Sequence, residues 1–258
     1  MTTTNTSSPS IALVTGGSRG LGKSTALHLA QQGHDVVLTY KSQKAEADAV
    51  VAQIQALGRK ALALQLDVAD SASFAAFATH LRQGLQAQWD RETFHVLVNN
   101  AGAGAHASLM ETTAEQFDLL VNMHFKGVFF LTQALLPLMA DGGRIVNVSS
   151  GLTRFALPGY SAYAAMKGAV EVLTRYMAKE LGPRGIAVNT VAPGAIATDF
   201  GGGAVRDNAQ LNAFVASQTA LGRVGEADDI GAMVASLVGD SNRWINAQRI
   251  EVSGGMFV

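Results

Sequence analysis

The chain has 258 residues, of which 48% are hydrophobic, and a length of this order fits one α/β domain with a large core. It contains no cysteine, which excludes disulfides, cysteine-bound zinc, iron–sulfur clusters and a thiol nucleophile. The formal net charge of −1, without a basic block, a long apolar run or a signal peptide, predicts a soluble cytoplasmic protein without nucleic-acid or membrane partners.

Apolar stretches alternate with helical patterns after residues 1–9, which are small and polar and are expected to form a disordered tail. Most of these stretches are apolar throughout, as in strands covered on both faces. Strands are expected at 11–15, 35–40, 61–66, 95–99, 144–149, 186–191 and 248–252. Helices are expected near 21–32, 43–57, 71–88, 113–140, 160–181 and 226–238. The alternation predicts one doubly wound Rossmann-type α/β domain over 10–258, with a seven-stranded, mainly parallel sheet and helices on both faces.

The stretch 195–225 shows neither pattern and carries three consecutive glycines, Gly201 to Gly203. It is long for a connection inside a compact domain. We therefore expect it to form a lid over a site.

A glycine-rich turn follows the first expected strand and opens the first helix. Gly16, Gly20 and Gly22 give the spacing G-x-x-x-G-x-G. Glycines at such a turn let backbone N–H groups approach phosphate groups at the helix N-terminus. The turn therefore predicts a nucleotide site.

The same turn also fits the phosphate loop of nucleoside triphosphatases, because Gly17 to Ser24 read G-x-x-x-x-G-K-S. On this alternative, Lys23 would hold the β- and γ-phosphates and Ser24 would bind magnesium. The metal would need a second acidic strand end, for which Asp67 is the only loose candidate.

A tyrosine and a lysine four residues apart, Tyr163 and Lys167, fall on one face of an expected helix. A neighbouring cation favours phenolate, which predicts a lowered tyrosine pKa and an acid/base role. Ser150 follows an expected strand, where an open α/β sheet builds its site, and its hydroxyl could donate to a carbonyl oxygen. Tyr40 and Lys44 have the same spacing, but Tyr40 ends a strand and this pair is interpreted as solvated.

Together these motifs resemble the short-chain dehydrogenase/reductase family in its compact, ketoreductase-like form. The resemblance covers the chain after residue 10. It rests on motifs in the family's order, namely 15–22, Asn99-Asn100-Ala101-Gly102, Asn122, Ser150, Tyr163 with Lys167, and Pro193-Gly194.

The resemblance implies a role for each matched residue. Tyr163 would be the proton donor or acceptor, and Lys167 would lower its pKa and bind the nicotinamide ribose. Ser150 would polarise the substrate carbonyl. Asn122 would support a water and the lysine in a proton relay. The implied reaction is reversible hydride transfer between a nicotinamide and a ketone or aldehyde.

The resemblance also implies a set of cofactor-binding residues besides Tyr163 and Lys167. These are Gly16, Ser18, Arg19, Gly20, Leu21, Gly22, Tyr40, Lys41, Asp67, Val68, Asn100, Ala101, Gly102, Pro193, Gly194, Ile196 and Thr198. NAD-selective enzymes place a carboxylate after the second strand, and none stands there. Arg19 and Lys41 instead offer two cations for a 2′-phosphate, which predicts NADP(H) as cofactor.

The expected function is that of an NADPH-dependent carbonyl reductase or alcohol dehydrogenase acting on a largely apolar substrate. Substrate contacts are expected from Leu152, Phe155, Leu157, Tyr160 and Phe200. A 3-oxoacyl-thioester reductase is the alternative within the family, because Arg154 or Arg206 could meet a phosphate. A non-catalytic dinucleotide sensor is a further alternative. The presence of Ser150, Tyr163 and Lys167 argues against it, because a sensor does not need all three.

Four further expectations concern individual residues, metal binding and assembly. Tyr160 lies seven residues before Lys167, the arrangement of enoyl-thioester reductases in this superfamily, but it is expected to line the substrate pocket. Neither His106 nor His124 is given a catalytic role, and His124 is expected to pack inside a helix. The sequence contains no cluster of His, Asp and Glu residues at metal-ligand spacing, so no metal site is expected. The resemblance implies a homotetramer.

Overall fold

Seven strands form a single, all-parallel sheet in the order β3-β2-β1-β4-β5-β6-β7. The computed structural model describes residues 9–258, so the expected tail lies outside the described residues except for Pro9. The strands are β1 (Ile11–Val14), β2 (Asp35–Tyr40), β3 (Ala61–Gln65), β4 (Phe94–Asn99), β5 (Met139–Val148), β6 (Ala187–Pro193) and β7 (Arg249–Val252). The predicted Rossmann-type fold is confirmed.

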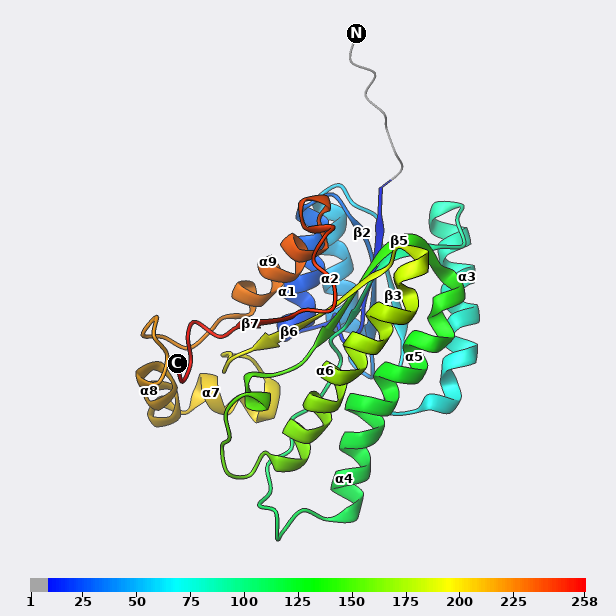
Figure 1. The fold of residues 1–258 in the computed structure, drawn as a ribbon. Helices are drawn as coiled ribbons and strands as arrows, with labels where there is room; N and C mark the ends of the chain where they lie inside the picture. Colours follow the sequence, from blue (N-terminus) through cyan, green and yellow to red (C-terminus); the bar gives the residue numbers. More distant parts are fainter. Residues whose placement is uncertain (1–8) are drawn as a thin grey trace.

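Helices cover both faces of the sheet (Figure 1). The helices of the described residues are α1 (Gly20–Gln31), α2 (Lys44–Ala56), α3 (Phe74–Trp89), α4 (Ala114–Leu120), α5 (Gly127–Leu135), α6 (Ser161–Leu181), α7 (Ala204–Asp207), α8 (Ala209–Ser217) and α9 (Ala227–Val238), of which α7 and α8 lie beyond the ends of the strands. Side chains alternate along β1, so that Ala12 and Val14 pack with α1, α2 and α9. Ile11 and Leu13 pack with α3, α5 and α6 on the opposite face. Burial on both faces explains why the strands are apolar throughout.

The strand order reverses at β1, which pairs with β2 on one side and with β4 on the other. The connections after these strands therefore leave the sheet in opposite directions. In open parallel sheets a crevice forms at this point, beyond the carboxyl ends of the strands. The fold thus places the glycine-rich turn after β1 opposite the loop after β4.

The expected helix near 113–140 is interrupted by a π-helical turn, Val121–Lys126, between α4 and α5. In this turn the amide of Gly127 donates to the carbonyl of Asn122, five residues back. Single π-helical turns rotate the side chains that follow them and are frequent at functional sites. The helical repeat assumed from the sequence is therefore out of phase across this turn.

The stretch 195–225 contains more regular structure than expected. A 3-10 turn, Phe200–Gly203, leads into α7 and α8. Gly201, Gly202 and Gly203 all have positive φ values, between 62° and 78°. Three consecutive left-handed residues need glycine, because a Cβ atom is strained in that region. The glycines therefore serve to turn the chain sharply into two short helices.

The helical stretch Ala114–Leu138 is long and apolar enough to cross a membrane by length and composition, contrary to the expectation from the sequence. About two-fifths of its most apolar window is buried inside the protein (39%), as Leu131 and Leu135 are in the core. Large apolar side chains remain exposed on this stretch and on the neighbouring α6, namely Phe117, Leu119, Phe129, Phe130, Val172 and Tyr176.

Candidate active site

A cavity of about 520 Å³ lies beyond the carboxyl ends of the strands, as the reversal of strand order predicts. Every predicted cofactor residue lines it, as do the five predicted substrate residues. Ser150, Tyr163 and Lys167 also line it, whereas Asn122 does not. The fold therefore brings all the candidate site residues except Asn122 together around one cavity.

The glycine-rich turn is closely packed against the loop after β4. A Cβ atom on Gly22 would lie 2.1 Å from the carbonyl oxygen of Gly16, so only glycine fits there. The side-chain amide of Asn100 donates to Thr15 O at 2.8 Å, and Thr15 Oγ1 accepts from the amide of Ala101 at 3.0 Å. These contacts hold the N-terminus of α1 open toward the cavity, where it can bind the pyrophosphate of a dinucleotide.

The geometry does not fit the alternative phosphate loop. The hydroxyl of Ser24 donates to the carboxylate of Asp228 on α9 at 2.6 Å, and neither Ser24 nor Lys23 lines the cavity. Asp67, the candidate metal ligand, pairs with Lys41 at 2.8 Å. The Gly-Lys-Ser sequence thus begins a helix that packs on α9, and the triphosphatase prediction loses its structural basis.

Two exposed cations stand at the nucleotide end of the cavity. The side chains of Arg19 and Lys41 are 64% and 63% exposed. Their ion pairs are loose or on the surface, with Arg19 Nη1 3.9 Å from Asp199 and Lys41 Nζ 2.8 Å from Asp67. Exposed pairs of this kind are weak and exchange partners easily. Both side chains are therefore able to turn to an added phosphate.

Ser150, Tyr163 and Lys167 meet at the middle of the cavity. Ser150 follows β5 and caps the short 3-10 turn Gly151–Thr153, its Oγ accepting from the amide of Leu152 at 3.2 Å. Tyr163 and Lys167 lie one turn apart on α6, and both are buried. Lys167 Nζ donates to Val148 O at 2.7 Å and lies 5.6 Å from the centroid of the Tyr163 ring.

Burial dominates the acid–base properties of both groups on α6. Burial raises the pKa of Tyr163 well above its ordinary value, and a hydrogen bond with Ser150 opposes this rise. Burial lowers the pKa of Lys167 to about 8. Burial of Tyr163 therefore acts against the lowered tyrosine pKa that the spacing to Lys167 predicts.

His124, and not Asn122, lines the cavity beside Tyr163, with the two ring centroids 5.1 Å apart. Its side chain is buried at 1% exposure, and its Nε2 lies 2.8 Å from the carbonyl oxygen of Ala103. A carbonyl only accepts, so Nε2 carries the proton and Nδ1 keeps its lone pair. Nδ1 is buried without a hydrogen-bond partner in the described part of the protein.

The interpretation of His124 as a residue that only packs inside a helix was incomplete, because the imidazole lines the cavity. Burial, followed by the charge of Lys167, lowers the His124 pKa to about 3, so the ring is neutral near pH 7. Gly102 makes room for it, since a Cβ at that position would lie 2.7 Å from His124 Cε1. The π-helical turn Val121–Lys126 brings His124 to the cavity, and the spacing of apolar residues in the sequence does not indicate such a turn.

The other end of the cavity is apolar. Besides the five predicted substrate residues, its lining includes Val205, Leu211, Val215 and Met256, which the sequence analysis missed. The Phe200 ring lies 5.9 Å from that of Tyr163, which places the start of the stretch 195–225 against the candidate catalytic residues. The histidine His106 packs edge-on against Tyr160, with ring centroids 5.0 Å apart.

The two arginines considered for phosphate contacts are both engaged elsewhere. Arg154 forms a two-point ion pair with Glu251, at 2.7 and 2.6 Å. Arg206 pairs with Asp199 and with Asp207. Neither lines the cavity.

Comparison with known proteins agrees with this geometry. Residues 16–257 match the family model described as enoyl-(acyl carrier protein) reductase. A 3-oxoacyl-(acyl-carrier-protein) reductase of Staphylococcus aureus is 38% identical over 249 residues, covering 96% of this chain and 98% of the relative.

Two solved structures are similar over nearly the whole chain. The promiscuous reductase LugOII, which catalyses keto-reduction at C1 in lugdunomycin biosynthesis, has a TM-score of 0.91 and 41% identity, covering 96% of this chain and 98% of LugOII. The angucycline C-6 ketoreductase LanV, solved with bound NADP, has a TM-score of 0.91 and 35% identity, covering 96% and 95%. This chain belongs to the short-chain dehydrogenase/reductase family and is an NAD(P)-dependent oxidoreductase acting on carbonyl or hydroxyl groups.

Proposed function

We propose that the protein is an NADPH-dependent reductase of uncharged, largely apolar ketones or aldehydes. The observation that carries the proposal is the position of the Ser150, Tyr163 and Lys167 side chains in the cavity. They lie between a nucleotide end with two cations and a substrate end lined by aliphatic and aromatic side chains. The reverse reaction, oxidation of the alcohol, uses the same groups.

Each catalytic group has one task in the reduction. Ser150 donates a hydrogen bond to the carbonyl oxygen and stabilises the charge that develops on it. Tyr163 delivers the proton to that oxygen as general acid. Lys167, as the ammonium, stabilises the phenolate left on Tyr163. When bound, the nicotinamide supplies the hydride to the carbonyl carbon.

The proposed preference for NADP(H) rests on Arg19 and Lys41, because β2 ends without a carboxylate that would repel a 2′-phosphate. Guanidinium and ammonium groups form charge-assisted hydrogen bonds with phosphate oxygens. The NADP bound by LanV supports the same choice.

A 3-oxoacyl-thioester is the second candidate substrate, favoured by the similarity to the Staphylococcus aureus reductase. The geometry gives it less support. Among the cavity-lining residues, the lysine and arginine side chains are Arg19, Lys41 and Lys167, and none of these stands at the substrate end. A carrier-linked substrate would need a cation for its phosphate near the mouth of the cavity.

The decisive experiment follows NADPH oxidation with a bulky aromatic ketone, an aliphatic ketone, an aldehyde and a β-ketoacyl thioester. We expect the aromatic ketone to give the highest kcat/KM, and Tyr163→Phe to abolish turnover while NADPH still binds. Tyr176→Phe, at an exposed tyrosine of α6 outside the cavity, is the matched control and keeps activity. Preference for the thioester would favour the second candidate, and full ketone activity of Tyr163→Phe would refute the mechanism.

We further propose that copies of this chain cover the exposed apolar face of α4, α5 and α6. Its six large side chains lie on adjacent helices, and closed symmetric assemblies commonly bury such faces. A homotetramer is expected in sedimentation analysis. Phe130→Glu should yield smaller species, and binding of the protein to lipid vesicles instead would contradict the assembly.

A further inference from the structure

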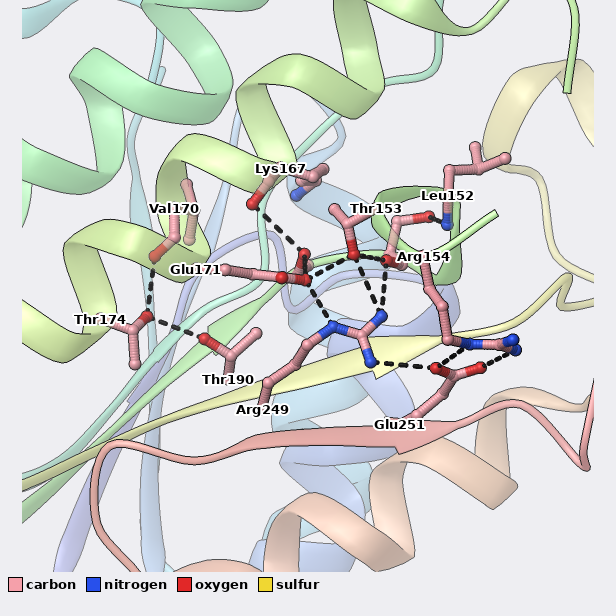
Figure 2. Close-up of polar contacts among 12 residues, drawn as sticks. Leu152, Thr153, Arg154, Lys167, Val170, Glu171, Thr174, Thr190, Arg249 and Glu251 are labelled. Atoms are coloured by element: carbon pink, nitrogen blue, oxygen red, sulfur yellow. Dashed lines mark hydrogen bonds and ion pairs between the residues drawn. The ribbon is translucent and has the colours of Figure 1, made fainter. Parts of the chain in front are cut away.

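A chain of four alternating charges connects α6 with β7 and with the loop after β5 (Figure 2). Arg249 Nε lies 2.8 Å from Glu171 Oε1, and Arg249 Nη1 lies 2.9 Å from Glu251 Oε2. Glu251 in turn holds Arg154. The carboxylate side chains are only 14% and 19% exposed, so each charge depends on its neighbours for compensation.

Glu171 binds both sides of the turn that carries Ser150. Its Oε1 accepts from Ser149 Oγ and from Thr153 Oγ1, each at 2.7 Å. Arg249 Nη2 approaches the same turn, 3.0 Å from Thr153 Oγ1 and 3.4 Å from Ser150 O. The residues immediately before and shortly after Ser150 are therefore fixed to one ion pair.

Glu171 also belongs to the helix that carries the other catalytic groups. It lies four residues after Lys167 and eight after Tyr163, so all three occur on one face of α6. A helix is stiff over eight residues, about 12 Å. Whatever fixes Ser150 to Glu171 therefore fixes it relative to the tyrosine hydroxyl.

We propose that Glu171 and Arg249 are positioning residues for the reduction, which hold the Ser150 hydroxyl at the distance from Tyr163 that the carbonyl oxygen requires. Neither residue lines the cavity, so both act through Ser150. The proposal rests on the function proposed above.

The other end of the charge chain supports the substrate wall. Arg154 donates to the carbonyl oxygens of Met256 and Phe257, and the Phe257 ring packs on Phe155 at 4.8 Å between centroids. Met256 and Phe155 line the cavity. Damage at the Glu171 end should therefore lower kcat, whereas damage at the Arg154 end should raise KM.

The test is a double-mutant cycle between Glu171→Gln and Ser150→Ala. We expect Glu171→Gln to lower kcat roughly 10- to 100-fold, with the Kd for NADPH unchanged, because a small displacement of a catalytic hydroxyl is costly. In the Ser150→Ala background the same substitution should change kcat less than twofold. An equal loss in both backgrounds, or none in the first, would overturn the proposal.

Two further variants separate positioning from general damage. Arg154→Gln should raise KM for the ketone roughly 5- to 10-fold at nearly unchanged kcat, because it loosens the wall and not the hydroxyl. Arg184→Gln removes an ion pair of similar length with Asp141, together with hydrogen bonds to the carbonyl oxygens of Leu136 and Met139. These contacts lie away from the cavity, so both constants should be unchanged.

Amide hydrogen exchange tests the positioning independently of turnover. In the protein without ligands, Glu171→Gln should speed exchange of the peptide 150–155 at least tenfold, while Arg184→Gln should not. Unchanged exchange refutes the positioning role whether or not a ketone is reduced. Faster exchange together with an inactive wild-type protein would refute the proposed function alone.

Discussion

The imidazole of His124 stands perpendicular to the ring of Tyr163, with their centroids 5.1 Å apart. The tyrosine thus has a neutral, buried neighbour on this side, whose Nδ1 has no hydrogen-bond partner among the described residues. Because the imidazole lies beside the proposed general acid, we expect it to assist when Tyr163 is reprotonated.

Replacing His124 by phenylalanine keeps an aromatic ring but removes both nitrogen atoms. We expect kcat to fall roughly tenfold, as for the loss of a hydrogen bond to a reacting group, with the Kd for NADPH unchanged. Steady-state kinetics with a fluorescence titration of NADPH would measure both. His80→Phe, at an exposed histidine on α3, is the control. A wild-type kcat in His124→Phe would assign the imidazole to packing alone.

The lowered Lys167 pKa predicts the pH dependence of reduction. As the pH rises through about 8, the ammonium loses its proton and no longer stabilises the phenolate. We expect kcat for ketone reduction to fall over this range in a pH-rate profile. Lys167→Arg should move the alkaline limb upward, because a guanidinium stays charged. A profile that is flat to pH 10 would contradict the assignment.

The same group makes stability depend on pH. Between pH 8 and 10.5 the unfolded chain retains a proton that the folded protein has released, so the free energy of unfolding increases with pH. The difference amounts to about 3 kcal/mol at most. Urea unfolding at pH 8 and pH 10 would measure it, and Lys167→Met should remove the increase.

Cofactor selectivity should depend on Arg19 and Lys41. Each alanine substitution is expected to weaken NADPH binding roughly tenfold, the value of one charge-assisted contact, and to leave NADH binding unchanged. Titrations of both nucleotides at two salt concentrations would show this, with a smaller salt effect in the variants. Lys23→Ala is the control, because Lys23 does not line the cavity. Equal losses for both nucleotides would contradict 2′-phosphate recognition.

The His124 ring fills the space that a side chain at position 102 would need. Gly102→Ala would place a methyl group 2.7 Å from His124 Cε1, and we expect a loss of about 1–3 kcal/mol in stability. Gly182→Ala, where nothing lies within 4 Å of the added Cβ, is the control in thermal unfolding. Adding His124→Ala to Gly102→Ala should recover part of the loss. Independent, additive effects would argue against the contact.

The sequence predicted the architecture well because its signals are local. Continuous apolar strands, helical repeats and the glycine turn at Gly16 each depend on a few adjacent residues, and together they indicated a parallel sheet. The Ser24 hydroxyl shows the limit, since its partner Asp228 lies 204 residues away. Only the fold reveals that Ser24, the magnesium ligand of the phosphate-loop pattern, is engaged in a contact between α1 and α9.

The candidate site was less predictable where geometry depends on the irregular turn in the helix. Asn122 resembles the family asparagine, yet the π-helical turn brings His124 to the cavity. The lowered tyrosine pKa was expected from spacing alone, whereas burial of Tyr163 works in the opposite direction. Desolvation depends on every surrounding element and is not encoded in a four-residue interval.

The pairing of β1 with both β2 and β4 has a consequence for the order in which the protein folds. Leu13 pairs with Val37, which is near it in the chain, and also with Leu97, which lies 84 residues after Leu13. Closing the longer loop costs more chain entropy, so β3-β2-β1 can associate before β4 joins them. The nucleotide cavity lies across that later junction. A dinucleotide that contacts both sides would bind only after the junction has closed and would slow its reopening.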